Sequence, residues 1–152
     1  MQNSIDFDNQ TDFILTQDFK EKLEEIFVEI LENLGIKAKQ CELIFVDNAT
    51  IKEINKEYRK VDKETDVLSF PLDSEFSNLI GSVLISLDFA KDIAQKFNHS
   101  LEDEMSLLFI HGILHLLGYD HEKDNGEHRE KEEFFIQKFS LPKSLIVRTL
   151  EL

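Results

Sequence analysis

The sequence predicts a domain of the α+β or α/β class, with about five helices and one small mixed β-sheet. Three observations predict this class. The chain has 152 residues, a length that suits one domain. Short apolar runs alternate with segments of helical periodicity, and the connections between them are short. No repeat, linker or change of composition divides the chain, so we expect residues 1–152 to form a single domain.

The chain is expected to begin with a short strand at 4–7 and a helix. Thr16 can act as the N-cap of that helix, since its hydroxyl can accept from the first free backbone N–H groups. Apolar residues then follow at helical spacing from Phe19 to Leu34. Gly35 is suited to end the helix, because glycine readily adopts the left-handed conformation found there.

The next elements are predicted to be a strand, a helix and a second strand. The apolar run at 41–47 indicates the first strand. Thr50 and Glu53 form a capping-box pattern and predict the start of the helix. The segment 66–72 is expected to be a strand at an edge of the sheet or to end there, since Pro71 has no N–H to donate.

A further strand at 81–87 is close enough in sequence to pair with the strand at 66–72. A helix from about residue 88 to 97 should follow it. Ser100 and Asp103 then make another N-terminal capping pattern.

The helix predicted at 101–117 carries apolar residues on nearly its whole circumference, which is typical of a helix buried in the domain. Gly118 is expected to end it. The last helix is predicted at about 126–139, and Pro142 stops it.

The charge balance excludes some classes of partner. The sequence has 17 basic and 31 acidic residues, a net charge of −14. A general nucleic-acid coat or a basic membrane-surface protein needs clustered Lys and Arg. A local basic site on an acidic body remains compatible with this composition.

Cysteine usage indicates a reducing compartment, because Cys41 is the single cysteine and no internal disulfide can form. The first residues form neither a basic stretch nor an apolar run, which argues against a secretory signal. No window approaches the ~20 apolar residues of a membrane span. We therefore expect a cytoplasmic protein that does not bind membranes.

Three histidines within eleven residues carry the strongest functional signal. His111 and His115 are four residues apart on the buried helix, which places them on one face. Gly118 can reverse the chain and return His121 as a third ligand. Three imidazoles would leave one tetrahedral position open on a zinc ion, as in catalytic rather than structural sites. Burying two imidazoles side by side is unfavourable unless something binds them.

The spacing also matches the zinc-protease pattern H-E-x-x-H-x-x-G-x-x-H. The glutamate that serves proteases as general base is replaced here by Gly112. General acid–base catalysis contributes typically about 10²–10⁴-fold. The ligand pattern is therefore protease-like, but we expect different chemistry.

The segment HGILHLLGYDH at 111–121 closely resembles the signature of the YbeY family of bacterial endoribonucleases. Tyr58 and Arg59, followed by TDVLSFP at 65–71, resemble the second block of that family, and GSVLIS at 81–86 resembles its third. Chain length and motif order agree as well. One departure is Ser82, where the family usually has an acid, so a role assigned to that acid does not transfer to this chain.

The resemblance implies a zincin-like α+β fold and a zinc-dependent endoribonuclease that acts on single-stranded RNA. It implies roles in maturing ribosomal RNA, notably the 3′ end of the small-subunit RNA, and in ribosome quality control. His111, His115 and His121 carry over as ligands of one Zn²⁺ per chain. Arg59 carries over as the functional arginine, and we expect Arg59 and His115 to be needed for cleavage. The expected partners are RNA and the small ribosomal subunit, not DNA, and the expected state is a monomer.

The surroundings of Arg59 support a phosphate contact. The window 52–63 holds five basic and three acidic residues, a net +2 in an acidic chain. A guanidinium is a planar fork suited to phosphate. The alternative is a solvated arginine at a helix end, where the helix dipole also favours it.

Other polar residues are interpreted as structural. We expect His99 at the surface and His128 on an exposed helix face, with His128 only a distant candidate for a fourth ligand. Asp120 is expected to be a turn residue or to orient a ligand, and neither it nor Asp124 identifies a general base. Cys41 and the phenylalanines in apolar patterns are assigned to the core (Phe27, Phe45, Phe134, Phe135 and Phe139).

Two other functions remain open from the residues. A zinc peptidase would use the shared ligand spacing, but Gly112 argues against it. A non-catalytic, zinc-stabilised ribosome-binding factor would explain why no general base is recognisable. The sequence does not decide the cleaved RNA, the native metal or whether a 2′-hydroxyl or a hydroxide attacks.

Overall fold

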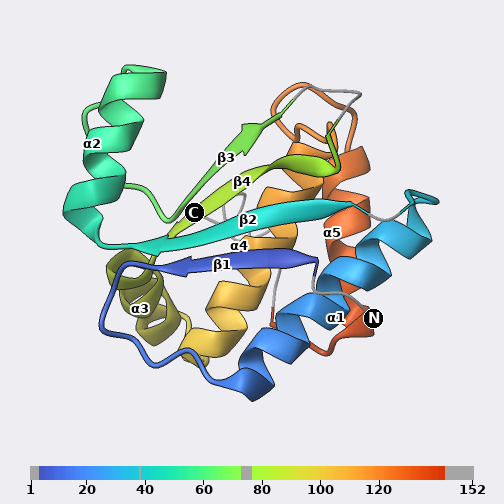
Figure 1. Ribbon diagram of the computed structural model, residues 1–152, viewed down its shortest axis with the longest axis horizontal. Coiled ribbons are helices and arrows are strands. Elements are labelled where there is room, and N and C mark those ends of the chain that lie inside the picture. The colour runs from blue at the N-terminus through green and yellow to red at the C-terminus, as the bar shows by residue number, and fades with distance from the viewer. Residues whose placement is uncertain (1–3, 38, 73–76, 143–152) are drawn as a thin grey trace.

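The computed structural model describes residues 4–37, 39–72 and 77–142. This part of the chain holds four strands and five helices, which confirms the predicted α+β fold (Figure 1). In chain order the elements are β1 (Ile5–Asn9), α1 (Gln17–Asn33), β2 (Gln40–Val46), α2 (Asn48–Arg59), β3 (Val67–Pro71), β4 (Leu79–Ser86), α3 (Leu87–Lys96), α4 (Leu101–Leu116) and α5 (Glu127–Lys138).

The four strands form one mixed sheet in the order β1-β2-β4-β3. β1 and β2 are parallel, and so are β2 and β4. β3 and β4 are antiparallel, with Leu68 opposite Leu84, which confirms the predicted pairing of these strands. β3 lies at an edge and ends at Pro71, where the missing N–H removes no ladder hydrogen bond.

Helices lie on both faces of the sheet. The larger apolar core joins alternate residues of β2 and β4, such as Leu43 and Val83, to residues of α1, α4 and α5. A smaller core on the other face packs Ile51 of α2 against Leu68 and Leu84. α2 therefore lies apart from α1, α4 and α5 in Figure 1.

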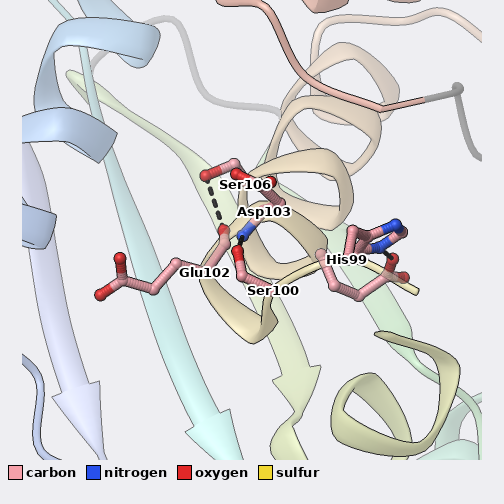
Figure 2. Close-up of polar contacts among 6 residues, drawn as sticks. His99, Ser100, Glu102, Asp103 and Ser106 are labelled. Atoms are coloured by element: carbon pink, nitrogen blue, oxygen red, sulfur yellow. Dashed lines mark hydrogen bonds and ion pairs between the residues drawn. The ribbon is translucent and has the colours of Figure 1, made fainter. Parts of the chain in front are cut away.

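Capping residues fix where the helices begin. The hydroxyl of Thr16 accepts from the N–H of Phe19 at 3.2 Å, and Ser100 accepts from Asp103 at 3.0 Å, as predicted (Figure 2). Gly35 has a φ of 68° after α1, also as expected.

The predicted start of α2 is wrong. Asp47 is the N-cap, and its carboxylate accepts from the N–H of Thr50 at 2.8 Å. An aspartate caps at least as well as a threonine, so the N-cap lies three residues before the predicted one and the helix begins at Asn48.

α4 runs through the middle of the domain. Most of its side chains are buried, from Glu104 to Leu116, as the all-round apolar pattern predicted. Gly112 lies against β4, where a Cβ atom would be 2.8 Å from Cγ1 of Val83 and 3.2 Å from the hydroxyl of Ser69. The close approach of the helix to the sheet at Gly112 positions His111 and His115 on the same helix.

In the described residues, no helix combines the length and the apolar character that crossing a membrane requires.

Candidate metal centre

The end of α4 and the turn after it bring the three predicted histidines to one end of the domain. His111 and His115 lie on the last turns of α4, and Gly118 follows with a φ of 103°. The N–H of Tyr119 donates to the carbonyl of Leu114 at 3.0 Å, which closes the helix end. The chain reverses here as predicted.

Two of the histidines have one ring nitrogen held by the protein. Nδ1 of His111 lies 3.0 Å from Oε1 of the buried Glu132, and Nδ1 of His115 lies 2.8 Å from the carbonyl oxygen of Tyr119. Both partners are acceptors, so Nδ1 donates and Nε2 carries the lone pair. Metal-binding histidines almost always have their other ring nitrogen fixed in this way.

Among the described residues, His111, His121 and His128 bring their ligand atoms close enough together to hold one metal ion. One nitrogen from each lies within 4.8 Å of the others. The predicted ligands His111 and His121 are thus brought together, with ring centroids 5.4 Å apart. His115 is exposed and lies outside this group of three, although its ring is parallel to that of His128 at 6.3 Å.

The prediction that His128 lies on an exposed helix face is wrong. Its side chain has no exposed area, because α5 turns it toward the other imidazoles. The charged letters around it, EHREKEE, suggested a solvated face. Helical periodicity is the signal that was missed. The buried residues of α5 are separated from His128 by four, seven and eight positions, which places them on one face of the helix (His128, Glu132, Phe135 and Ile136).

The chemistry of this cluster fits a metal ion. Within the described ranges, Nδ1 of His121 and both ring nitrogens of His128 are buried without a hydrogen-bond partner. Burial, followed by repulsion from His111 and His121, lowers the pKa of His128 to about 3. A neutral imidazole is the form that binds Zn²⁺ and other transition metals. A metal cation bound here would therefore give the buried imidazole nitrogens the partner that they lack.

Arg59 lies away from these histidines. It is the last residue of α2, on the opposite face of the sheet from α4, and its side chain is exposed. Among the residues that the structure describes, no hydrogen bond or ion pair joins Arg59 to a histidine of the cluster. Tyr58 beside it is 65% exposed and packs edge-on against Phe70.

The acidic residues near the turn have backbone roles. Asp120 accepts from the N–H of Glu122, which confirms it as a turn residue. Asp124 accepts from the N–H groups of Gly126 and His128 at 2.9 and 3.0 Å, and so holds the start of α5 in place.

Ser82, the departure from the family pattern, donates to Oε1 of Glu42 on the adjacent strand at 2.8 Å. Residues 42 and 82 are directly paired between β2 and β4. A carboxylate is therefore present next to position 82, but it is supplied by another strand.

His99 is partly buried, so its predicted surface position is wrong. Its Nε2 lies 2.7 Å from Oε1 of Glu104, which has no exposed area (Figure 2). Asp66 lies near enough to Glu104 for the two carboxylates to repel, and burial together with this repulsion raises the pKa of Asp66.

The core assignments hold with one exception. Cys41, Phe27, Phe45 and Phe135 are fully buried, and Phe139 packs against the core. Phe134 is 47% exposed, because it lies on the outer side of α5 next to the buried Phe135.

Comparisons with known proteins agree with the arrangement of the motifs. A family profile described as "Endoribonuclease YbeY" matches residues 4–140. A protein named Endoribonuclease YbeY from Aliarcobacter butzleri is 53% identical over 148 residues, which cover 95% of this chain and 98% of that protein. Its namesake from Helicobacter pylori is 49% identical over 145 residues, covering 95% and 98%. The solution structure of TM1509 from Thermotoga maritima is similar with a TM-score of 0.63 and 32% identity, covering 88% of this chain and 87% of that one.

Proposed function

The chain belongs to the YbeY family of endoribonucleases, and on that premise we propose that it is a zinc-dependent hydrolase that cuts single-stranded RNA. The observation that supports a metal in this proposal is that one nitrogen each of His111, His121 and His128 lies within 4.8 Å of the others, and that ring nitrogens of His121 and His128 are buried without a partner in the described residues. We further propose that residues 1–152 act as one metal-dependent hydrolase domain.

The proposed ligands of one Zn²⁺ are His111, His115 and His121. Glu132 and the carbonyl of Tyr119 hold Nδ1 of His111 and of His115, so that Nε2 of each is the nitrogen presented to the ion. Zinc held there would supply a Lewis acid for a phosphoryl oxygen and would lower the pKa of a water molecule toward ≈ 7.

Arg59 is the proposed phosphate contact. Its guanidinium is exposed at the end of α2, where Lys56 and Lys60 add further positive charge. An arginine can donate two parallel hydrogen bonds to a phosphate, which positions the RNA strand and stabilises its negative charge. This basic segment can attract RNA to a molecule that is acidic overall.

The biological substrate that we propose is ribosomal RNA, at the 3′ end of the small-subunit RNA, together with a role in ribosome quality control. The proposed setting is the cytoplasm, where the protein acts as a monomer on the small ribosomal subunit. A peptidase function is disfavoured, because position 112 faces β4 and has no room for a glutamate.

The test is to measure metal content and RNA cleavage together. Protein without a histidine tag would be compared with His111→Ala, and with His99→Gln as a matched loss of a histidine elsewhere. We expect one zinc per chain and cleavage of single-stranded RNA in the wild type and in His99→Gln, with both lost in His111→Ala. Bound zinc without cleavage of ribosomal or unstructured RNA would contradict the proposal, and so would cleavage that persists in His111→Ala.

The same digests can decide the attacking group. Products with 2′,3′-cyclic phosphate ends indicate attack by the neighbouring 2′-hydroxyl, whereas ordinary phosphate ends indicate attack by water. Double-stranded RNA and single-stranded DNA of the same sequence serve as controls for the preference for unpaired RNA.

A further inference from the structure

His128 lies inside the cluster of imidazoles rather than beside it. It is the second residue of α5, and its ring stacks on His111 with centroids 4.7 Å apart. The centroid of His121 lies 5.5 Å away and that of His115 lies 6.3 Å away. Each of the three predicted ligands therefore contacts or faces this fourth ring.

The ring of His128 has no role in the hydrogen bonding that the structure describes. Both of its nitrogens are buried without a partner in the described residues. Leaving a buried polar group unsatisfied costs about 1–3 kcal/mol, and a histidine in a protein core normally has at least one nitrogen bonded. The packing of Tyr119 at 6.1 Å supplies only ring contact.

The position of the ring is fixed by the backbone. Asp124 accepts from the N–H of His128 at 3.0 Å and from the N–H of Gly126 at 2.9 Å, so its carboxylate anchors the first turn of α5. Glu132, one turn further on the same helix, bonds His111. One helix thus carries both a side chain that orients a predicted ligand and, next to it, a ring whose two nitrogens have no hydrogen-bond partner in the described residues.

The ring nitrogens of His128 also lie close enough to those of the predicted ligands to share a metal ion with them. The atoms of His128, His111 and His121 form the group within 4.8 Å, whereas His115 is exposed outside it. We propose that His128 is itself a ligand of the metal, in addition to His111, His115 and His121, and that the exposed His115 is the ligand that water or a phosphate oxygen can replace, so that a reactive position remains. This inference rests on the proposed function only in that a metal ion binds here.

A spectroscopic test distinguishes ligation from packing. The apo wild type, His128→Phe and His128→Cys would be loaded with Co²⁺. The wild type has a single thiol, that of the fully buried Cys41 in β2, and provides the baseline. We expect His128→Cys to show a thiolate-to-cobalt charge-transfer band that the wild type lacks, because a cysteine at a ligand position binds as thiolate.

Zinc affinity and stability give the second readout. His128→Phe keeps an aromatic ring but no nitrogen, and we expect its zinc affinity, measured against a competing chelator, to fall by at least about tenfold. Without metal, this variant should be as stable as the wild type or more stable, since an apolar ring replaces an unsatisfied polar one. A purely structural role predicts the reverse, namely loss of apo stability with unchanged affinity.

The inference is overturned if His128→Phe binds zinc as tightly as the wild type, if His128→Cys shows no thiolate band, or if the wild type binds no metal. Failure of the proposed function looks different. If the wild type binds zinc and the thiolate band is present, but no RNA is cut, His128 remains a ligand and the endoribonuclease proposal fails.

Discussion

The buried carboxylate of Glu132 lies 3.0 Å from Nδ1 of His111 and joins α5 to α4 at the proposed metal site. A carboxylate can only accept, so His111 donates from Nδ1 and keeps Nε2 for the ion. The two residues are 21 positions apart in the sequence, so the tautomer of a predicted ligand depends on the packing of a separate helix.

We expect Glu132→Gln to weaken metal binding by about 10–100-fold, because residues that orient a ligand contribute that much to affinity. Zinc competition against a chelator measures the change. Glu130→Gln is the matched control, since it removes one carboxylate from an exposed position of the same helix. An equal loss in both variants would show that overall charge, and not the bond to His111, sets the affinity.

We expect Arg59→Ala to lower kcat/KM for single-stranded RNA by roughly 10–100-fold, the factor for a lost charge-assisted hydrogen bond. The free energy of unfolding should change by no more than about 0.5 kcal/mol, because the side chain is exposed. Arg129→Ala removes an exposed arginine from α5 and should leave cleavage unchanged. Full activity of Arg59→Ala would remove this residue from the mechanism.

We expect Gly112→Ala to destabilise the protein by about 1–3 kcal/mol, because the added methyl group overpacks the contact with Val83. In an exposed helix the same change stabilises by about 1 kcal/mol, so the sign is informative. Urea unfolding of Gly112→Ala, Val83→Ala and the double variant measures the coupling. Strict additivity would show that the two side chains do not clash.

We expect Asp66→Asn to stabilise the protein at neutral pH. Burial and repulsion from Glu104 raise the pKa of Asp66, so the folded state keeps its proton to a higher pH than the unfolded state does. The contribution of Asp66 to the free energy of unfolding is therefore fully present below the pKa of the carboxyl group in the unfolded chain. It is lost as the pH rises through the higher pKa of the folded state. Urea unfolding across pH 4–7 should show a smaller decline in Asp66→Asn than in the wild type, and no such difference in the exposed Asp62→Asn.

Local patterns were sufficient for most elements of the fold. Thr16 and Ser100 cap their helices as predicted, because capping depends on a side chain and an N–H only three residues away. The capping-box pattern of Thr50 and Glu53 misplaced the start of α2, because Asp47 forms the cap in place of Thr50. The strand order could not be predicted from local pattern, since β4 lies between β2 and β3 through contacts distant in sequence.

The histidine cluster was only partly predictable for the same reason. His111, His115 and His121 lie in one continuous motif, and its glycine turn has the expected positive φ. His128 and Glu132 reach the cluster from α5, and their charged neighbours concealed the buried face that they form with Phe135 and Ile136. Burial of His99 depends on Glu104 and could not be inferred from its position before a helix.

The contact between Gly112 and β4 also limits which enzymatic activities this domain can acquire by substitution at position 112. A Gly112→Glu exchange restores the letters of the peptidase motif, yet the new side chain would start 2.8 Å from Val83 and 3.2 Å from the hydroxyl of Ser69, on the side of α4 that faces the sheet. Exchange between nuclease and peptidase chemistry therefore requires more than the Gly112→Glu substitution, because the helix or the side chains that face it must also shift.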